Sequence, residues 1–243
     1  ETDHQVVALA GDGCLQEGVA AEAASLAGHL ALDNLTILYD SNDVTLDAMA
    51  NASQSESVID RFTAYGYHCI RVEGGHDMEE IGHALAQARA NKGKPTFIEF
   101  KTLIAKGIPE VAGTAGGHGE GGAKFAESAR LGLGLPEEPF YVSDEVRGFF
   151  QQRTAEQVEN RKRWNETFQA WRAANPEKAA LLDSGLKREV PADLMDRVQV
   201  FPEDAKVATR AAGGQVINDL AKAMPLLVSG SADLHGSTKN YLK

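Results

Sequence analysis

The sequence predicts an α/β fold: a doubly wound, mostly parallel sheet with helices on both faces. Short apolar runs alternate with helical patterns over roughly the first hundred residues, and the apolar runs end in Gly- and Asp-rich turns. The chain has 243 residues, of which 43% are hydrophobic and 24% charged, as in ordinary globular proteins. That length suffices for one large domain or two smaller ones.

The first strand, helix and strand hold the most informative residues. An apolar run at residues 6–10 ends at a Gly-Asp-Gly turn centred on Asp12, and a small-residue helix follows. A second apolar run at residues 35–39 ends at Asp-Ser-Asn, of which Asn42 is the last residue. Because the carboxyl ends of parallel strands share one edge of a sheet, we expect Asp12 and Asn42 to converge there.

The same alternation continues to about residue 102. After a polar loop we expect, in order, a helix at 60–65, a strand at 68–72, a helix at 78–91 and a strand at 96–102. Asp77 is placed to cap the helix at 78–91. A glycine-rich stretch at 113–122 then follows, with one histidine, His118, inside it.

The second half of the chain is more helical and more charged. Residues 143–175 suggest two helices, whose aromatic side chains are expected to be buried faces rather than a nucleotide-stacking site. A helix at 208–224 and a strand at 226–229 suggest that a second α/β domain begins there. The predicted division is a first domain at 1–186, an interdomain linker at 187–204 and the start of a second domain at 205–243.

The pair formed by Asp12 and Asn42 suits a hard cation such as Mg²⁺, which takes oxygen ligands and shares them with phosphates. Gly-Asp-Gly alone is a common turn. Followed some thirty residues later by Asn, however, it resembles the thiamine diphosphate signature. The surrounding GDGCLQEG and EAASLAGHLALDNLTILYDSN resemble transketolases in particular, and the resemblance covers essentially the whole chain.

This resemblance implies a thiamine-diphosphate-binding fold and a metal site. It makes residues 1–186 a diphosphate-binding domain whose N-terminal part is missing, and residues 205–243 the truncated start of a pyrimidine-binding domain. Asp12 and the Asn42 side chain would bind the metal, with the backbone carbonyl of Val44 as a third ligand. Asp12, Asn42 and Gly13 would then hold the cofactor, with Gly13 touching its diphosphate. Glu17 matches a glutamate that couples the family's two active sites, although an acidic residue at a helix N-terminus is also favoured by the helix dipole.

Three further residues receive roles from the resemblance. His118 matches the second histidine of the family's GTH-x-x-HG loop, which faces both diphosphate and substrate, and we expect it to be catalytic. The first histidine of that pattern is replaced here by Ala115. Arg210 and Ser237 match an arginine and a serine that hold the phosphate of the sugar substrate, and a guanidinium suits phosphate because it binds bidentately.

The implied reaction moves a two-carbon glycolaldehyde unit from a ketose phosphate to an aldose phosphate, in the pentose phosphate pathway. Its implied cofactors are thiamine diphosphate and Mg²⁺ (or Ca²⁺ or Mn²⁺), and the implied assembly is a homodimer. Both ends of the sequence suggest an internal fragment. The glutamate that activates the cofactor would lie beyond Lys243, so we expect this fragment alone to be inactive.

Composition limits the other functions. The net charge of −11 argues against a nucleic-acid or anionic-membrane surface. Cys14 and Cys69 form no disulfide framework or metal motif, so a cytoplasmic location is expected.

Two alternatives stay open. One is another thiamine diphosphate enzyme, either a dihydroxyacetone synthase or a 1-deoxyxylulose-5-phosphate synthase. The other is a non-catalytic α/β module that binds a nucleotide or diphosphate through the Gly-Asp-Gly turn. Loss of thiamine diphosphate binding on Asp12→Ala would favour the cofactor class, and tighter binding of a nucleotide would favour the module.

Overall fold

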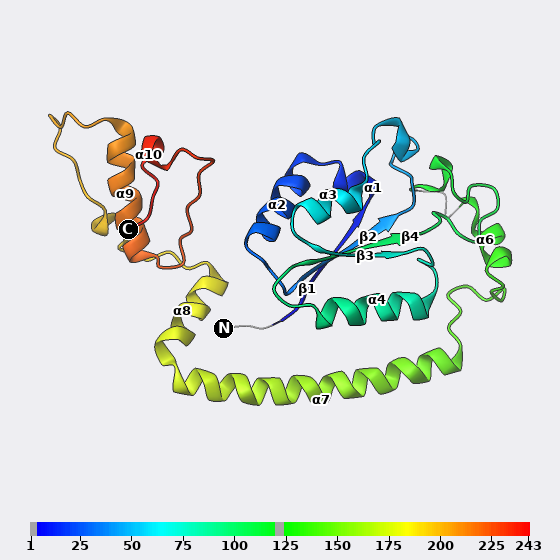
Figure 1. Ribbon diagram of the computed structural model, residues 1–243. Helices are drawn as coiled ribbons and strands as arrows, with labels where there is room; N and C mark the ends of the chain where they lie inside the picture. The colour runs from blue at the N-terminus through cyan, green and yellow to red at the C-terminus, as the bar shows by residue number, and fades with distance from the viewer. Residues whose placement is uncertain (1–3, 120–123) are drawn as a thin grey trace. The chain divides into compact units, whose positions relative to one another are not determined.

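The computed structural model describes residues 4–119 and 124–243 of the chain (Figure 1). It divides into two compact units, residues 1–141 and 142–243. The predicted domain limits at 186 and 204 come from the polar, proline-containing stretch around them, and they stay predictions. None of the described helices combines the length and the apolar character that a membrane crossing needs.

The first unit is built on a parallel sheet of four strands. Its strands are β1 (Val6–Gly11), β2 (Leu35–Ser41), β3 (His68–Val72) and β4 (Thr96–Lys101). Their spatial order is β1-β2-β4-β3, and every neighbouring pair is parallel. The expected α/β class with a parallel sheet is confirmed, and the carboxyl ends of all four strands lie at one edge.

Helices cover both faces of this sheet (Figure 1). The helices of the first unit are α1 (Asp12–Leu15), α2 (Gly18–His29), α3 (Val58–Ala64), α4 (Met78–Ala90) and α6 (Ala126–Gly132). On one face, α2 and α3 pack on a core that includes Phe62, Tyr67 and Phe97. On the other, α4 packs on Val72 and Ile98. This is the doubly wound arrangement that the alternating pattern predicts.

Local sequence explains where these elements begin. Asp77 caps α4, as predicted: one of its carboxylate oxygens accepts hydrogen bonds from the backbone N–H groups of Glu79 (2.8 Å) and Glu80 (3.2 Å). Gly75, two residues earlier, donates its N–H to Lys101 O at 3.1 Å. A Cβ at Gly75 would lie 2.3 Å from that oxygen, so only glycine lets this turn approach the end of β4.

Tyr67 is a buried phenol whose hydroxyl has no hydrogen-bond partner among the described residues. Burial raises the pKa of Tyr67 to about 12, with a smaller contribution from Cys69. An unfolded tyrosine ionises near pH ~10. The folded state therefore binds the phenolic proton more tightly, and the stability that this gives is present below about pH 10 and lost between about pH 10 and 12.

Tyr67→Phe is expected to leave the free energy of unfolding unchanged or to raise it by about 1 kcal/mol, because it removes an unpaired buried hydroxyl. The loss of stability between about pH 10 and 12 should also become shallower. Urea unfolding at pH 8 and at pH 11 measures both effects, with Tyr141→Phe as the matched control because Tyr141 is exposed. A clearly less stable Tyr67→Phe protein would contradict the interpretation of this hydroxyl.

The second unit is helical in its described residues. It contains α7 (Asp144–Ala174), α8 (Pro176–Lys187), α9 (Thr209–Ala223) and α10 (His235–Thr238). Arg172 near the end of α7 forms two hydrogen bonds with the carboxylate of Asp183 on α8, at 2.8 and 2.6 Å. The same guanidinium lowers the pKa of Asp183. This bidentate pair links α7 to α8.

Residues 143–175 form one helix, so the prediction of two was wrong. Ser143 caps α7, and the 31 residues that follow contain no proline. Between the two aromatic groups lie mainly Gln, Arg, Glu, Ala and Lys, which favour a continuous helix. Burial differs along α7: the side chains of Phe149, Phe150 and Trp164 are exposed within this chain, whereas those of Phe168 and Trp171 are half-buried.

Residues 226–229 are not a strand: the described part of the second unit has no neighbouring strand with which they form a ladder. An apolar run that lacks such a partner remains irregular.

The glycine-rich stretch contains a short 3₁₀ turn at Ala115–Gly117, and residues 120–123 at its end lie outside the described residues.

Candidate functional site

A cavity of about 630 Å³ opens at the carboxyl edge of the sheet in the first unit. It is lined by residues near or beyond the carboxyl ends of β1, β2 and β4. The lining residues are Gly11, Asp12, Gly13, Cys14, Glu17, Asp40, Asn42, Val44, Thr45, Leu46, Ile104, Gly117, His118 and Gly119. The structure thus brings together the six residues that the sequence marked in this part of the chain: Asp12, Gly13, Glu17, Asn42, Val44 and His118.

Asp12 is the most constrained of these residues, with 3% of its surface exposed. Its Oδ1 accepts a hydrogen bond of 2.6 Å from the Tyr39 hydroxyl. Its Oδ2 accepts two more, each of 3.1 Å, from the backbone N–H groups of Asn42 and Asp43. A carboxylate has about four acceptor positions, so three bonds orient Asp12 and leave one position free.

Tyr39 reinforces this arrangement from β2. Burial raises the pKa of Tyr39 above its ordinary value, and the hydrogen bond to Asp12 raises it further. The phenol therefore stays protonated and acts as a donor toward Asp12 over the whole physiological pH range. A neutral donor leaves the carboxylate charge available to a cation.

The chain turns sharply after Asn42. Asp43 adopts a positive φ of 64°, a conformation that Asp tolerates better than most residues. The Asn42 side chain closes the turn, because its Oδ1 accepts a hydrogen bond of 3.1 Å from Val44 N. The turn brings the Val44 backbone beside Asn42 at the cavity wall.

Asp12 is the first residue of the one-turn helix α1, where the sequence suggested only a turn. Glu17 then occupies the N-cap position of α2 with no capping hydrogen bond from its side chain. Gly13 faces open space, since among the described residues beyond its chain neighbours and its own helix backbone no atom lies within 4 Å of the position that a Cβ would take there. The missing side chain leaves room for a ligand beside Asp12.

His118 reaches the cavity from the loop that follows β4. Gly117, just before it, packs closely: a Cβ there would lie 2.9 Å from both Val111 O and the Ala105 side chain. Glycine therefore allows the loop to fold against itself and present His118 at the cavity. Ala115 is not among the lining residues, so this departure from the family pattern lies outside the cavity wall.

The donor set fits a hard cation. A carboxylate, a side-chain amide oxygen and a backbone carbonyl are the oxygen ligands that Mg²⁺ and Ca²⁺ take. Among the described residues no three His, Cys, Asp or Glu side chains are grouped as a metal site.

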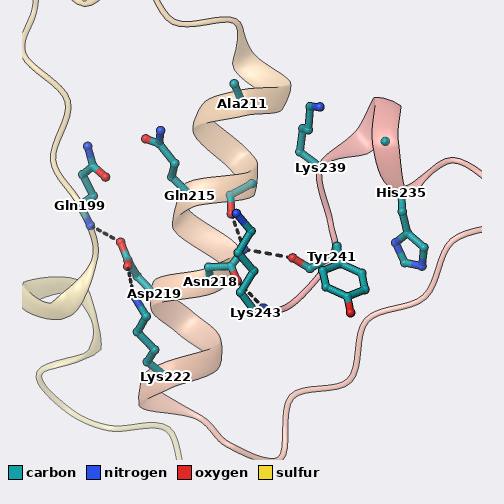
Figure 2. A pocket seen from close by; sticks show the side chains of 12 residues that line it. Gln199, Ala211, Gln215, Asn218, Asp219, Lys222, His235, Lys239, Tyr241 and Lys243 are labelled. Atoms are coloured by element: carbon teal, nitrogen blue, oxygen red, sulfur yellow. Dashed lines mark hydrogen bonds and ion pairs between the residues drawn. The ribbon is translucent and has the colours of Figure 1, made fainter.

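Arg210 and Ser237 belong to the second unit. There, α9 and the segment after residue 234 enclose another cavity, of about 650 Å³, which Figure 2 shows. Ala211 and Gly236 line it, but their neighbours Arg210 and Ser237 do not. Both of these side chains are exposed, and their predicted contact with a sugar phosphate stays a prediction.

Sequence reasoning missed three residues at or near the first cavity. Asp40 lines it, whereas Tyr39 and Thr102 do not but form hydrogen bonds with the lining residues Asp12 and Asp40. The available signal was the same for all three: a polar side chain near the carboxyl end of a strand. Only the sheet order, with β2 beside β4, shows which of them meet.

Comparison with known proteins gives consistent matches. The family model described as "Transketolase, thiamine diphosphate binding domain" matches residues 1–191. The chain is 56% identical to a transketolase of Physarum polycephalum and 50% identical to one of Dictyostelium discoideum. Each alignment covers 99% of this chain, but 36% and 37% of those proteins.

Solved structures agree with the sequence matches. A transketolase structure from Leishmania mexicana superposes with a TM-score of 0.88 at 35% identity, over 98% of this chain and 36% of that one. A Pichia stipitis transketolase in complex with sedoheptulose 7-phosphate gives a TM-score of 0.87, also at 35% identity. The chain thus spans a little over a third of the length of the relatives that it matches.

Proposed function

Because the chain belongs to the transketolase family and its residues 1–191 match the family's thiamine diphosphate binding domain, we propose that it forms part of an active transketolase. The proposed reaction transfers a two-carbon glycolaldehyde unit from a ketose phosphate to an aldose phosphate. The observation that supports it is the meeting of Asp12, Asn42 and His118 at one cavity. The chain supplies the side of the site that binds metal and diphosphate.

Asp12, the Asn42 carboxamide and the Val44 carbonyl would hold Mg²⁺, or Ca²⁺ or Mn²⁺ in its place. One carboxylate and two neutral oxygens leave the ion with net positive charge, which attracts a diphosphate. Gly13 and Asn42 would contact that diphosphate from the protein side. The free position on Asp12 and the open space at Gly13 support this assignment.

Thiamine diphosphate, when bound, supplies the carbanion chemistry that breaks and forms carbon–carbon bonds next to a carbonyl. The chain's own groups would bind, orient and move protons around it. His118 is proposed as the catalytic residue that faces both diphosphate and substrate, since imidazole accepts and donates protons near neutral pH. Glu17, at the cavity wall, is proposed to couple this site to a second one.

The remaining roles extend this proposal to substrate and assembly. Arg210 and Ser237 are proposed to hold the phosphate of the sugar substrate, and the exposure of both side chains leaves them accessible. The pentose phosphate pathway, a homodimeric full-length protein and a cytoplasmic location are proposed from the family resemblance. The net charge of −11 supports a protein that binds neither nucleic acid nor membranes.

The test is calorimetric titration of thiamine diphosphate into the full-length protein, with and without Mg²⁺. We expect binding that depends on Mg²⁺, together with transfer between sugar phosphates that EDTA removes and Mg²⁺ restores. Binding without sugar-phosphate transfer would favour a dihydroxyacetone synthase, a 1-deoxyxylulose-5-phosphate synthase or a non-catalytic module. No binding by the folded protein would overturn the cofactor assignment.

His118→Ala is expected to lower kcat/KM for sugar-phosphate transfer by about 100-fold, because it removes a proton-transfer group at the cavity. Steady-state kinetics of the full-length protein measure this. His83→Ala is the matched control, since His83 is exposed on α4 and does not line the cavity. Equal kinetics for the two variants would contradict a catalytic role for His118.

A further inference from the structure

The Asn42 carboxamide is held in one orientation from both of its ends. Its Oδ1 accepts a hydrogen bond of 3.1 Å from Val44 N, and its Nδ2 donates one of 3.2 Å to Asp40 Oδ2. A backbone N–H only donates and a carboxylate only accepts. A flipped carboxamide would therefore set two donors against each other at Val44 and two acceptors against each other at Asp40.

Asp40 is itself anchored across the sheet. The Thr102 hydroxyl donates a hydrogen bond to Asp40 Oδ1, which leaves Oδ2 for Asn42. Asp40 lies near the end of β2 and Thr102 directly follows β4, and these two strands are paired in parallel. A chain of hydrogen bonds thus runs from hydroxyl to carboxylate to carboxamide along the wall of the candidate site.

This chain of contacts matters because Asn42 offers a cation only one oxygen. A side-chain amide presents a ligand oxygen in one orientation and a repelling N–H₂ group in the other. The hydrogen bond to Val44 uses one of the two lone pairs on Oδ1, so one lone pair is left for a ligand. Whatever fixes the carboxamide therefore decides whether that lone pair is presented.

We infer that Asp40 is a positioning residue that keeps Asn42 Oδ1 turned toward the bound cation, and that Thr102 holds Asp40 in place for this task. The inference rests on the proposed function, because it requires a divalent cation at Asp12 and Asn42. It adds a role for two residues that do not themselves bind the metal. Partners that orient a ligand in this way typically change metal affinity by about 10- to 100-fold when they are removed.

The test measures the binding of Mn²⁺ to the full-length protein in the presence of thiamine diphosphate. The electron paramagnetic resonance signal of the free ion gives the unbound Mn²⁺, so no activity assay is needed. Asp40→Ala is expected to weaken Mn²⁺ binding by about 10- to 100-fold, because Asn42 Nδ2 loses its acceptor. Asp40→Asn should stay within about fivefold of the unmodified protein. Its oxygen still accepts from Asn42, and the Thr102 hydroxyl rotates to accept from its amide.

Asp33→Ala is the matched control. Asp33 is also partly buried and accepts one hydrogen bond, from Gly93 N at 3.0 Å, but it precedes β2 at the opposite edge of the sheet. We expect its Mn²⁺ affinity to be unchanged. If Asp40→Ala does not fold, Thr102→Val replaces it as the test variant. We expect Thr102→Val to bind Mn²⁺ measurably more weakly, by less than tenfold.

Three results would overturn the inference. The first is an unchanged Mn²⁺ affinity in Asp40→Ala, which would show that the Asn42 carboxamide needs no support from Asp40. If Asp40→Ala does not fold, an unchanged affinity in Thr102→Val would show the same. Asp40→Asn binding as weakly as Asp40→Ala would show that Asp40 is instead a direct ligand. Mn²⁺ binding that is absent, or indifferent to Asp12→Asn, would remove the proposed cation site and the inference with it.

Discussion

Asp12→Asn is expected to weaken Mg²⁺-dependent binding of thiamine diphosphate by at least about 100-fold, or ~2.8 kcal/mol. The substitution removes the only negative charge that the proposed ligand set offers the cation. It should leave the fold intact, because the asparagine oxygen still accepts from the two backbone N–H groups. Its amide group then donates to the Tyr39 hydroxyl in place of accepting from it. Calorimetric titration of the full-length protein at fixed Mg²⁺ measures the loss.

Asp12→Ala, unlike Asp12→Asn, is expected to affect folding as well as binding. It leaves the Tyr39 hydroxyl and the N–H groups of Asn42 and Asp43 without their acceptor. Each such group costs about 1–3 kcal/mol where water does not replace the partner, so this variant should lose stability as well as binding. Asp33→Asn, at the far edge of the sheet, should change neither. Unchanged cofactor binding in Asp12→Asn would contradict the proposed metal site.

Phe97→Ala is expected to lower the free energy of unfolding of the first unit by about 3–5 kcal/mol. Phe97 lies on β4 with 0% of its surface exposed. It stacks on Phe62 with ring centroids 3.8 Å apart and contacts Tyr39 at 5.8 Å. The cavity left behind would thus lie between α3 and the strand that carries Tyr39.

The two units require a measurement that separates them. Both tryptophans lie on α7 in the second unit, so their fluorescence does not report on the first unit directly. Hydrogen exchange of the β2 and β4 amides does. Phe140→Ala is the matched control, since the Phe140 side chain is fully exposed and its loss should change stability by less than about 0.5 kcal/mol. Equal exchange rates in both variants would contradict the assigned core.

Sequence reasoning succeeded where a local signal marks an element. All four strands of the first unit were predicted to within two residues because each is an apolar run bounded by turn residues. The cap at Asp77 was predicted from residue type alone. The meeting of Asp12 and Asn42 followed from a rule about strand ends in parallel sheets.

It failed where the outcome depends on distant contacts. Whether residues 226–229 form a strand is decided by a neighbouring strand, and no local pattern supplies one. α7 is continuous because no proline interrupts it. The two separate groups of aromatic residues in its sequence had instead suggested two helices. Asp40 was missed because its partner, Thr102, is more than sixty residues away in the sequence. The roles assigned to the site residues themselves stay predictions.

The hydrogen bonds that hold Asp12 have a thermodynamic consequence. The carboxylate is oriented by groups of the sheet and the turn, and all of these contacts are made within the protein itself. An incoming ion then immobilises little additional protein, so the conformational entropy of binding on the protein side is small. Affinity at such a preorganised site is governed by the charge of the ion and by the water that it must shed.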